Sequence, residues 1–180
     1  MRHLTERDRL DRFMVALGHA GRQPARVYFT GGASAVLLGW RTTTIDIDLA
    51  LVPDSDELLR AIADLKERLE VNIELASPAH FIPELPGWDT RSLYIRREGP
   101  IAFYHYDFYA QALAKIERGH TQDHADVRSM LAAHLVEPAR LRELFDAIRP
   151  ALFRYPALDE ASFQAAVERA LVNEGGEGTP

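Results

Sequence analysis

Hydrophobic and polar positions divide the chain into two parts, one that mixes strands with helices and one that is helical throughout. In the first part, apolar residues recur at helical spacing in some segments, as in Leu10, Phe13 and Leu17. They alternate with polar residues in others, as between Thr44 and Val52. The pattern predicts helices over 4–20, 31–40 and 54–69, and strands over 26–30, 44–52, 71–75, 92–96 and 101–106. The expected fold class is therefore α+β, with a mixed β-sheet flanked by helices.

Capping residues place the ends of the helices. Thr5 and either Asp54 or Ser55 are the expected N-caps in the first part. Gly119 is expected to end one later helix, and Pro138 fits the first turn of another. The second part predicts helices over 107–118, 121–135, 138–148 and 159–171. We therefore expect an α/β core over 1–106, a C-terminal helical lobe packed on it over 107–172, and a flexible tail over 173–180.

Composition narrows the classes of protein and of site. The chain has 180 residues, no cysteine and a net charge of −6. Disulfides, thiolate metal sites and cysteine nucleophiles are thereby excluded, and the acidic charge argues against a broad nucleic-acid footprint. No apolar run approaches the roughly 20 residues of a membrane span, and the N-terminus lacks an apolar signal core. We expect a cytoplasmic protein without a membrane partner.

Two carboxylates lie in the alternating strand over 44–52. Ile45, Ile47 and Leu49 are expected on one face of it, which places Asp46 and Asp48 together on the other. Two carboxylates about 7 Å apart on a strand repel each other unless a cation lies between them. Mg²⁺ meets that need, since it binds one or two carboxylates together with substrate phosphates.

A glycine pair precedes this strand. Gly31 and Gly32 follow a short strand and open a buried helix. Glycine lets the backbone approach a ligand closely, and a helix N-terminus offers N–H groups to a phosphate. We expect this turn, with Ser34 nearby, to hold the β- and γ-phosphates of a nucleoside triphosphate. Beside Asp46 and Asp48 it gives the outline of a nucleotidyl-transfer site that uses two Mg²⁺ ions.

The spacing of these two motifs is similar to that of a known family. A glycine pair followed by thirteen residues and then Asp46-Ile-Asp-Leu49 resembles the signature of the DNA polymerase beta-like nucleotidyltransferase superfamily. The segment 31–51 looks like small bacterial members that include abortive-infection and toxin-type proteins. Arg41 and Thr43 match their Arg-x-Thr approach with one inserted residue. The resemblance implies Mg²⁺-dependent transfer of a nucleoside monophosphate to RNA, a protein or a small molecule, and an antitoxin or neighbour protein as a partner.

A later segment is similar to the helical motif of the same proteins. Lys115 and Arg118 lie three residues apart, and Asp123 and Asp126 follow. The cations are expected either on the phosphates of the nucleotide or on a solvated helix face. Asp123 lies in line with apolar residues and needs a cationic partner, so an ion pair and a role in the nucleotide site remain alternatives.

The sequence differs from the superfamily pattern at the third carboxylate of the metal site. Glu74 lies on the polar face of the strand over 71–75 and could supply it, whereas Asn72 could occupy the equivalent position and weaken the site. Asp107, at the end of a later strand, ranks behind both. If the site is short of a ligand, the alternative function is a catalytically inactive module that binds a nucleotide or a partner.

Overall fold

The computed structural model describes residues 4–172 and divides them into two compact units. Residues 4–77 and 92–106 form the first unit, and residues 78–91 and 107–172 form the second. Each unit is therefore built from two separate stretches of chain.

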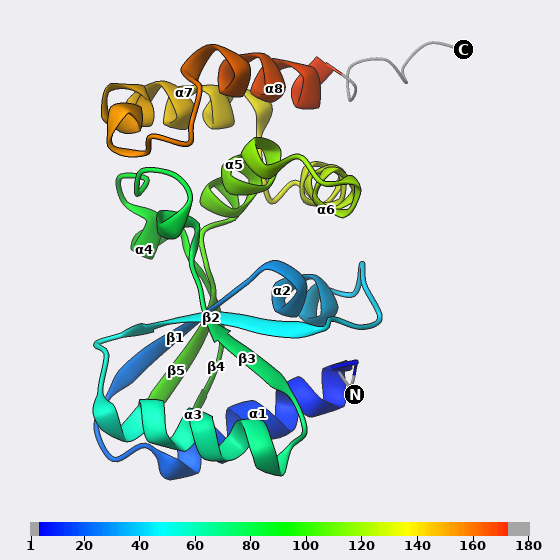
Figure 1. The fold of residues 1–180 in the computed structure, drawn as a ribbon. Coiled ribbons are helices and arrows are strands. Elements are labelled where there is room, and N and C mark those ends of the chain that lie inside the picture. Colours follow the sequence, from blue (N-terminus) through cyan, green and yellow to red (C-terminus); the bar gives the residue numbers. More distant parts are fainter. Residues whose placement is uncertain (1–3, 173–180) are drawn as a thin grey trace. The chain divides into compact units, whose positions relative to one another are not determined.

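The first unit contains a five-stranded sheet in the order β3-β2-β1-β5-β4 (Figure 1). The outer neighbours β2–β3 and the central pair β1–β5 are parallel, whereas β1–β2 and β4–β5 are antiparallel. The strands are β1 (Ala25–Thr30), β2 (Asp46–Val52), β3 (Asn72–Leu75), β4 (Leu93–Glu98) and β5 (Ile101–His105). The mixed sheet flanked by helices confirms the predicted fold class.

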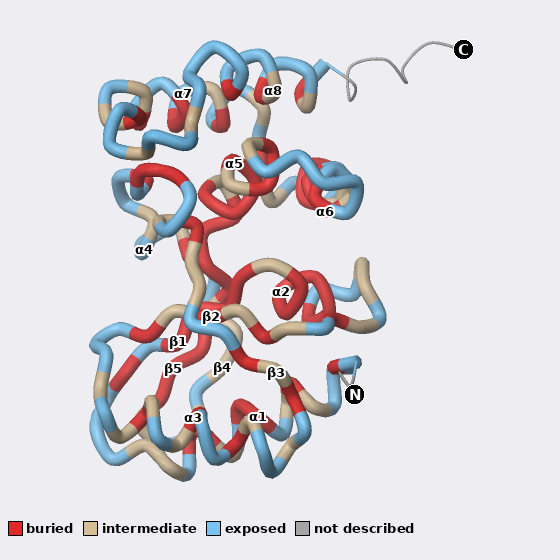
Figure 2. Tube along the Cα trace, in the orientation of Figure 1, coloured by how far each residue is buried: buried red, intermediate tan, exposed pale blue. Residues whose placement is uncertain are grey.

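Helices α1 (Arg7–Ala20) and α3 (Asp56–Arg68) cover one face of this sheet (Figure 1). Their apolar stripes meet the inward residues of the strands in one core, shown as buried in Figure 2. Phe13, Phe29 and Phe103 lie at its centre without solvent exposure. Burial of such side chains stabilises the unit by about 2–3 kcal/mol for each. Ser55 caps α3 by accepting a hydrogen bond of 3.2 Å from the Leu58 N–H, as one of the two predictions had it.

Helix α2 (Gly31–Leu38) begins at the residue that follows β1. Its residues from Gly32 to Leu37 are buried, which fits the absence of a polar face in the sequence. Gly39 ends it in the left-handed conformation, at φ 91°. The predicted turn into a short buried helix is therefore confirmed, and the helix needs no intervening loop.

Three boundary expectations in the first unit are wrong. Thr5 does not cap α1, since Glu6 takes that position and Thr5 pairs with Thr44 in an isolated β-bridge. Ile45 precedes β2 and is 45% exposed, so the inward alternation begins only at Ile47. Leu75, expected on the apolar face of β3, is 48% exposed. In each case the residue lies at the end of an element, where the strand pattern no longer fixes the direction of a side chain.

The second unit is helical among its described residues. Its helices are α4 (Trp88–Arg91), α5 (Phe108–Arg118), α6 (Thr121–Ala132), α7 (Pro138–Ile148) and α8 (Glu160–Val172), with 3-10 turns η1 (Pro78–His80) and η2 (Arg149–Arg154). Gly119 ends α5 at φ 69° and Pro138 lies in the first turn of α7, as predicted. His120 is the N-cap of α6, with Asp123 completing a capping box.

Segment 78–91 belongs to the second unit, whereas the predicted boundary had kept all residues up to 106 together. The reason lies in its contacts. Ile82 and Leu85 are buried, and the Ala79 carbonyl accepts a 2.9 Å hydrogen bond from the Tyr155 hydroxyl. The predicted tail over 173–180 lies outside the described residues. None of the described helices combines the length and the apolar character that crossing a membrane requires.

Candidate functional site

Asp46 and Asp48 lie on the face of β2 that points away from α1 and α3. Ile47 and Leu49, which alternate with them, are fully buried in the core, whereas both aspartates are partly exposed. The two-residue period of a strand sets this arrangement. The structure thus places both carboxylates side by side, as the sequence predicts.

The glycine turn lies directly beside Asp48. Thr30, the last residue of β1, pairs with Asp48 across the antiparallel ladder, and Gly31 follows at φ 57°. A Cβ on Gly31 would lie 3.1 Å from Asp48 Oδ2. Gly32 is more confined, since a Cβ there would lie 2.0 Å from Thr44 Oγ1. Gly32 is therefore needed for space, whereas Gly31 is favoured by its left-handed backbone and lies in close contact with Asp48.

The first turn of α2 therefore begins against the carboxylate face. Peptide N–H groups in the first turn of a helix have no partner within the helix and carry partial positive charge. An anionic group placed there would lie close to Asp48, and the two could share a cation. The structure brings together the phosphate and metal halves of the predicted site.

Arg41 and Thr43 lie in the connection between α2 and β2, and both are partly exposed. The Arg41 Nη1 atom lies 3.3 Å from the position that a Cβ on Gly32 would take. The Arg41 guanidinium is therefore next to the glycine turn. Its place agrees with a phosphate contact, which stays a prediction.

Ser34 is fully buried and its hydroxyl points into the protein. It donates to the Phe29 carbonyl at 3.1 Å and lies 2.9 Å from His105 Nδ1. A hydroxyl has one proton, so His105 Nδ1–H must be the donor in the second bond. Ser34 therefore fixes the first turn of α2 to β1 and β5, and its hydroxyl faces away from a phosphate held by that turn.

His105 is a residue that sequence reasoning missed. Burial lowers the pKa of its imidazole from 6.5 to about 4, so the ring is neutral at physiological pH. No short motif marks it, because Ser34 and His105 are far apart in the chain and meet only when β5 pairs with β1.

Asn72 takes the position beside Asp46, and Glu74 the position beside Asp48, in the parallel pairing of β2 with β3. The Asn72 amide donates to Asp46 Oδ1 and, at 3.3 Å, to Glu74 Oε1. It thus lies between two carboxylates. Within residues 4–172, no group of three or more His, Cys, Asp or Glu side chains is placed to hold a metal ion.

The donor set nonetheless fits a metal that is shared with a substrate. Asp46 and Asp48 supply hard carboxylate oxygens on one face, and Mg²⁺ commonly takes its remaining ligands from substrate phosphates and water. The adjoining helix N-terminus is suited to those phosphates. Asp107, the third candidate carboxylate, is engaged elsewhere: Arg91 donates to its Oδ2 from Nη2 at 2.6 Å and from Nε at 3.1 Å.

Lys115, Arg118 and Asp123 meet in the second unit, together with Asp126. Lys115 Nζ lies 2.6 Å from Asp126 Oδ2 and 3.4 Å from Asp123 Oδ1, and Arg118 donates two bonds to Asp123. Burial alone would raise the pKa of Asp123, but the hydrogen bonds of Arg118 and the charges of Lys115 and Arg118 lower it overall. The predicted need of Asp123 for a cation is met twice.

The aromatic residues near the end of β5 pack in two directions. Phe103 stacks on Phe29 in the core, at 5.9 Å between ring centroids. Tyr104 stacks on Tyr28 at 5.2 Å, on the opposite face of the sheet. Core packing accounts for Phe103, and the buried Tyr28 packs against Tyr104 on the other face.

Comparisons with known proteins give one result. No curated protein and no solved structure matches the chain. A family model described as "Nucleotidyltransferase of unknown function (DUF6036)" matches residues 8–169, which span both units. The matched region includes Gly31, Asp46 and Asp48, and the sheet has the mixed form expected of a nucleotidyltransferase. The chain therefore belongs to this family of nucleotidyltransferases of unknown function.

Proposed function

We propose that this protein transfers a nucleoside monophosphate from a nucleoside triphosphate to an acceptor, with Mg²⁺ as cofactor. The observation that supports this most is the placement of Gly31 against Asp48, with a Cβ position 3.1 Å from Asp48 Oδ2. It joins a helix N-terminus, suited to phosphate, to a pair of carboxylates suited to a metal.

Asp46 and Asp48 are the proposed metal ligands, with Glu74 in register beside Asp48 as the third. Bound there, two Mg²⁺ ions would supply activation of an acceptor hydroxyl and charge stabilisation of the triphosphate. The N–H groups at Gly31 and Gly32 orient the β- and γ-phosphates, and Arg41 adds a positive charge beside the turn. Ser34 holds the turn in place through its hydrogen bonds with the Phe29 carbonyl and with His105.

Lys115, Arg118 and Asp123 are proposed to contribute to nucleotide binding in different ways. The Arg118 side chain is 45% exposed, whereas those of Lys115 and Asp123 are 5% and 4% exposed. Arg118 can therefore contact a phosphate, while Asp123 holds its guanidinium in place and Lys115 in turn holds Asp123.

Transfer is tested with triphosphates labelled at the α-phosphate, because only this label follows the monophosphate group. The protein is incubated with Mg²⁺ and each of the four labelled ribonucleotides, in the presence of RNA, protein extract or a small-molecule fraction. Label should reach one acceptor class and fall by at least about 100-fold in Asp46→Asn and Asp48→Asn. A γ-label should not transfer. If wild-type transfer equals that of both variants in all fractions, the proposed activity is wrong.

A second candidate function rests on Asn72. Its amide is hydrogen-bonded to Asp46 where a third carboxylate could have stood. A site with only two carboxylates can bind a nucleotide without catalysing its transfer. Calorimetric titration with Mg²⁺ and each triphosphate, combined with absence of label transfer, would favour this binding module over the enzyme.

The resemblance to toxin-type proteins motivates a biological test. We propose that the acceptor is a cellular component whose modification stops growth and that a neighbouring gene encodes the antidote. Expression in a bacterial host should slow growth, Asp48→Asn should restore it, and co-expression of the adjacent reading frame should do the same. Normal growth on expression of active protein would argue for a housekeeping role.

A further inference from the structure

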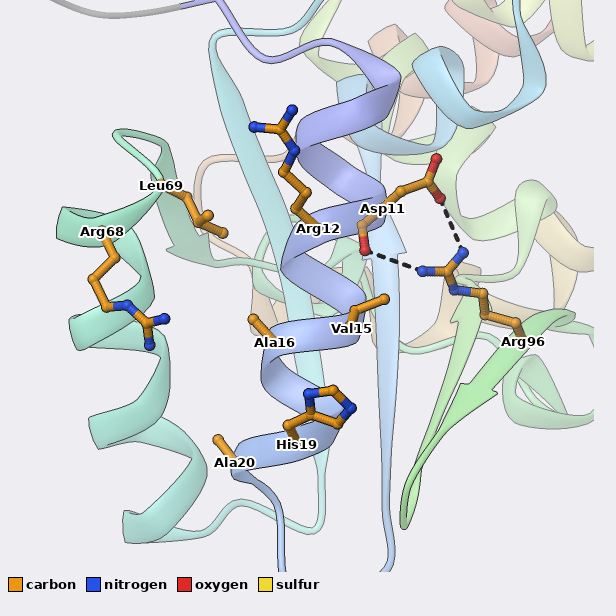
Figure 3. Close-up of a pocket in the computed structure, with 9 residues that line it drawn as sticks. All are labelled: Asp11, Arg12, Val15, Ala16, His19, Ala20, Arg68, Leu69 and Arg96. Atoms are coloured by element: carbon orange, nitrogen blue, oxygen red, sulfur yellow. Dashed lines mark hydrogen bonds and ion pairs between the residues drawn. The ribbon is translucent and has the colours of Figure 1, made fainter.

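A groove of about 870 Å³ lies on the outer surface of the first unit, on the helical layer over α1 (Figure 3). Its floor is apolar and consists of Val15, Ala16 and Ala20 on α1 and Leu69 at the end of α3. Ala16 and Leu69 also pack against the core from its edge, whereas Val15 faces outward. Val15 is 36% exposed.

Two arginines and a histidine surround this apolar floor. Arg12 and His19 lie toward opposite ends of the exposed face of α1, and Arg68 extends from α3 (Figure 3). All three are exposed, and none has a hydrogen bond or ion pair with any described residue. Arg96, the third arginine of the groove, is compensated, because it forms ion pairs of 3.1 Å with Asp11 and with Glu98. In a chain of net charge −6, Arg12 and Arg68 are therefore two positive charges of the groove that no described carboxylate pairs with.

The form of the groove favours a helix as the occupant. From Arg12 to Ala20 the floor runs for about 12 Å along α1, close to two helical turns. Ala16 and Ala20 are four residues apart, so their small side chains lie on one line and allow another backbone to come near. Apolar anchors at i, i+4 and i+7 of a partner helix fit such a floor.

Charge complementarity specifies the partner. We propose that this groove binds an amphipathic helix of another protein, one that carries carboxylates on both sides of an apolar stripe. The carboxylates would pair with Arg12 and Arg68, and the apolar stripe would cover Val15 and Leu69. Because α1 covers the face of the sheet opposite Asp46 and Asp48, the bound helix leaves the carboxylate face accessible. The proposal thus goes beyond the transfer activity and does not depend on it.

The test uses a defined probe, a fluorescein-labelled, end-capped helical peptide of about four turns with leucines at i, i+4, i+7 and i+11 and glutamates beside them. Its matched control has lysine in place of every glutamate. Fluorescence polarisation with the full chain should give a Kd of about 10–100 μM for the acidic peptide and at least about ten-fold weaker binding for the basic one.

Variants then locate the binding. Arg12→Glu/Arg68→Glu should weaken binding of the acidic peptide at least about ten-fold, since each reversal replaces attraction by repulsion. Arg22→Glu/Arg128→Glu makes the same change in net charge on exposed residues outside the groove and should leave binding unchanged. Ala16→Trp should block the floor. Asp46→Asn/Asp48→Asn should bind the peptide like the wild type, which separates this proposal from the transfer activity.

Several results would overturn the proposal. Equal binding of the two peptides, no binding up to about 1 mM, or equal losses in both double variants would exclude recognition by the groove cations. Self-association abolished by Ala16→Trp would make a second copy of this chain the occupant. Stronger binding to phosphatidylglycerol vesicles than to the peptide, lost in Arg12→Glu/Arg68→Glu, would make the groove a lipid-binding surface.

Discussion

At the scale of single residues, Gly31 combines two constraints, of which Gly39 carries only one. It has a left-handed backbone at φ 57°, and a Cβ added to it would lie 3.1 Å from Asp48 Oδ2. Gly39 has the left-handed backbone at φ 91° but nothing within 4 Å of its Cβ position. Comparison of the two positions separates backbone strain from crowding at the carboxylate.

We predict that Gly31→Ala and Gly39→Ala each lower the free energy of unfolding by about 1–2 kcal/mol, because an L-residue is strained in this conformation. Only Gly31→Ala should also reduce nucleotidyl transfer, since its methyl group would press on Asp48. Urea denaturation and the α-label assay measure the two effects. Equal activity in the two variants would show that the turn does not need to lie against Asp48.

His105 gives the first unit a dependence on pH. The folded protein keeps the imidazole neutral down to a pKa of about 4, whereas the unfolded chain protonates it near 6.5. Between these values the unfolded state binds more protons, so stability is complete above about pH 6.5 and falls as the pH drops toward 4. The full loss would amount to roughly 3 kcal/mol.

His105→Asn should remove this dependence, because asparagine can still donate to Ser34 and does not titrate. We predict that the wild type loses about 2 kcal/mol more than this variant between pH 7 and pH 5 in urea denaturation. Parallel losses in both proteins would assign the acid sensitivity to other groups.

At this scale the sequence predicted the principal carboxylates but not their surroundings. Asp46 and Asp48 follow from a two-residue period, which is local. The hydrogen bond from Asn72 to Asp46 depends on the register between β2 and β3, and the bond from His105 to Ser34 depends on the pairing of β1 with β5. No local pattern encodes either register.

At the scale of elements, the hairpin of α5 and α6 is held by buried charges. Lys115 is the cation common to Asp123 and Asp126, and all three are almost completely buried. Removal of one partner from such a cluster leaves a buried charge uncompensated. The cluster is therefore expected to be sensitive to substitution even in the absence of nucleotide.

Lys115→Met should lower the free energy of unfolding by about 3–5 kcal/mol. Lys115→Met/Asp126→Asn should lose less than the single variant, since it also removes the carboxylate whose cation is lost, whereas Asp123 keeps Arg118. Urea denaturation of the double-mutant cycle measures the coupling. If Lys115→Met keeps its stability and loses nucleotide binding, Lys115 is a nucleotide ligand and not part of a structural cluster.

The type of each helix or strand was predictable because it depends on periodicity, whereas the exact ends of some of these elements were not. The helix at Pro138 and the stop at Gly119 follow from the chemistry of single residues. Thr5, by contrast, has the chemistry of an N-cap but is drawn into a bridge with Thr44. A contact distant in sequence outweighs the local preference there.

At the scale of the whole molecule, the boundary at residue 106 was visible in the sequence, where strands give way to helices. The assignment of segment 78–91 to the second unit could not be predicted, because the segment has few periodic positions and several prolines. Its buried residues Ile82 and Leu85, and the ion pair of Arg91 with Asp107, connect it to the second unit.

A fragment of residues 1–106 should therefore behave poorly. It would carry Ile82 and Leu85 without α5, and Arg91 without Asp107, so apolar surface that is buried in the full chain would be exposed. We predict that this fragment aggregates, and that Ile82→Ser/Leu85→Ser within it improves its solubility. Size-exclusion chromatography measures both, and a monodisperse wild-type fragment would contradict the expectation.

Ligand binding should raise the stability of the full chain. A triphosphate with Mg²⁺ at 100 times its Kd adds about 2.7 kcal/mol to the unfolding free energy. We predict a rise in Tm for the wild type with both ligands, a smaller one for Asp46→Asn/Asp48→Asn, and none with Mg²⁺ alone for that variant. An equal rise in both proteins would place the nucleotide away from the carboxylates.

The interleaving of the two units also sets an order for folding during synthesis. Strands β1, β2 and β3 leave the ribosome together with α1 and α3, but β5, which pairs directly with β1, follows only after 78–91 has emerged. Segment 78–91 can complete its contacts only after α5 and Tyr155 have been synthesised. At the usual 5–20 residues per second, Tyr155 follows its partner Ala79 by about four to fifteen seconds. A nascent chain halted between residues 91 and 106 would thus expose two incomplete cores at once, and this is the interval in which a chaperone would be most needed.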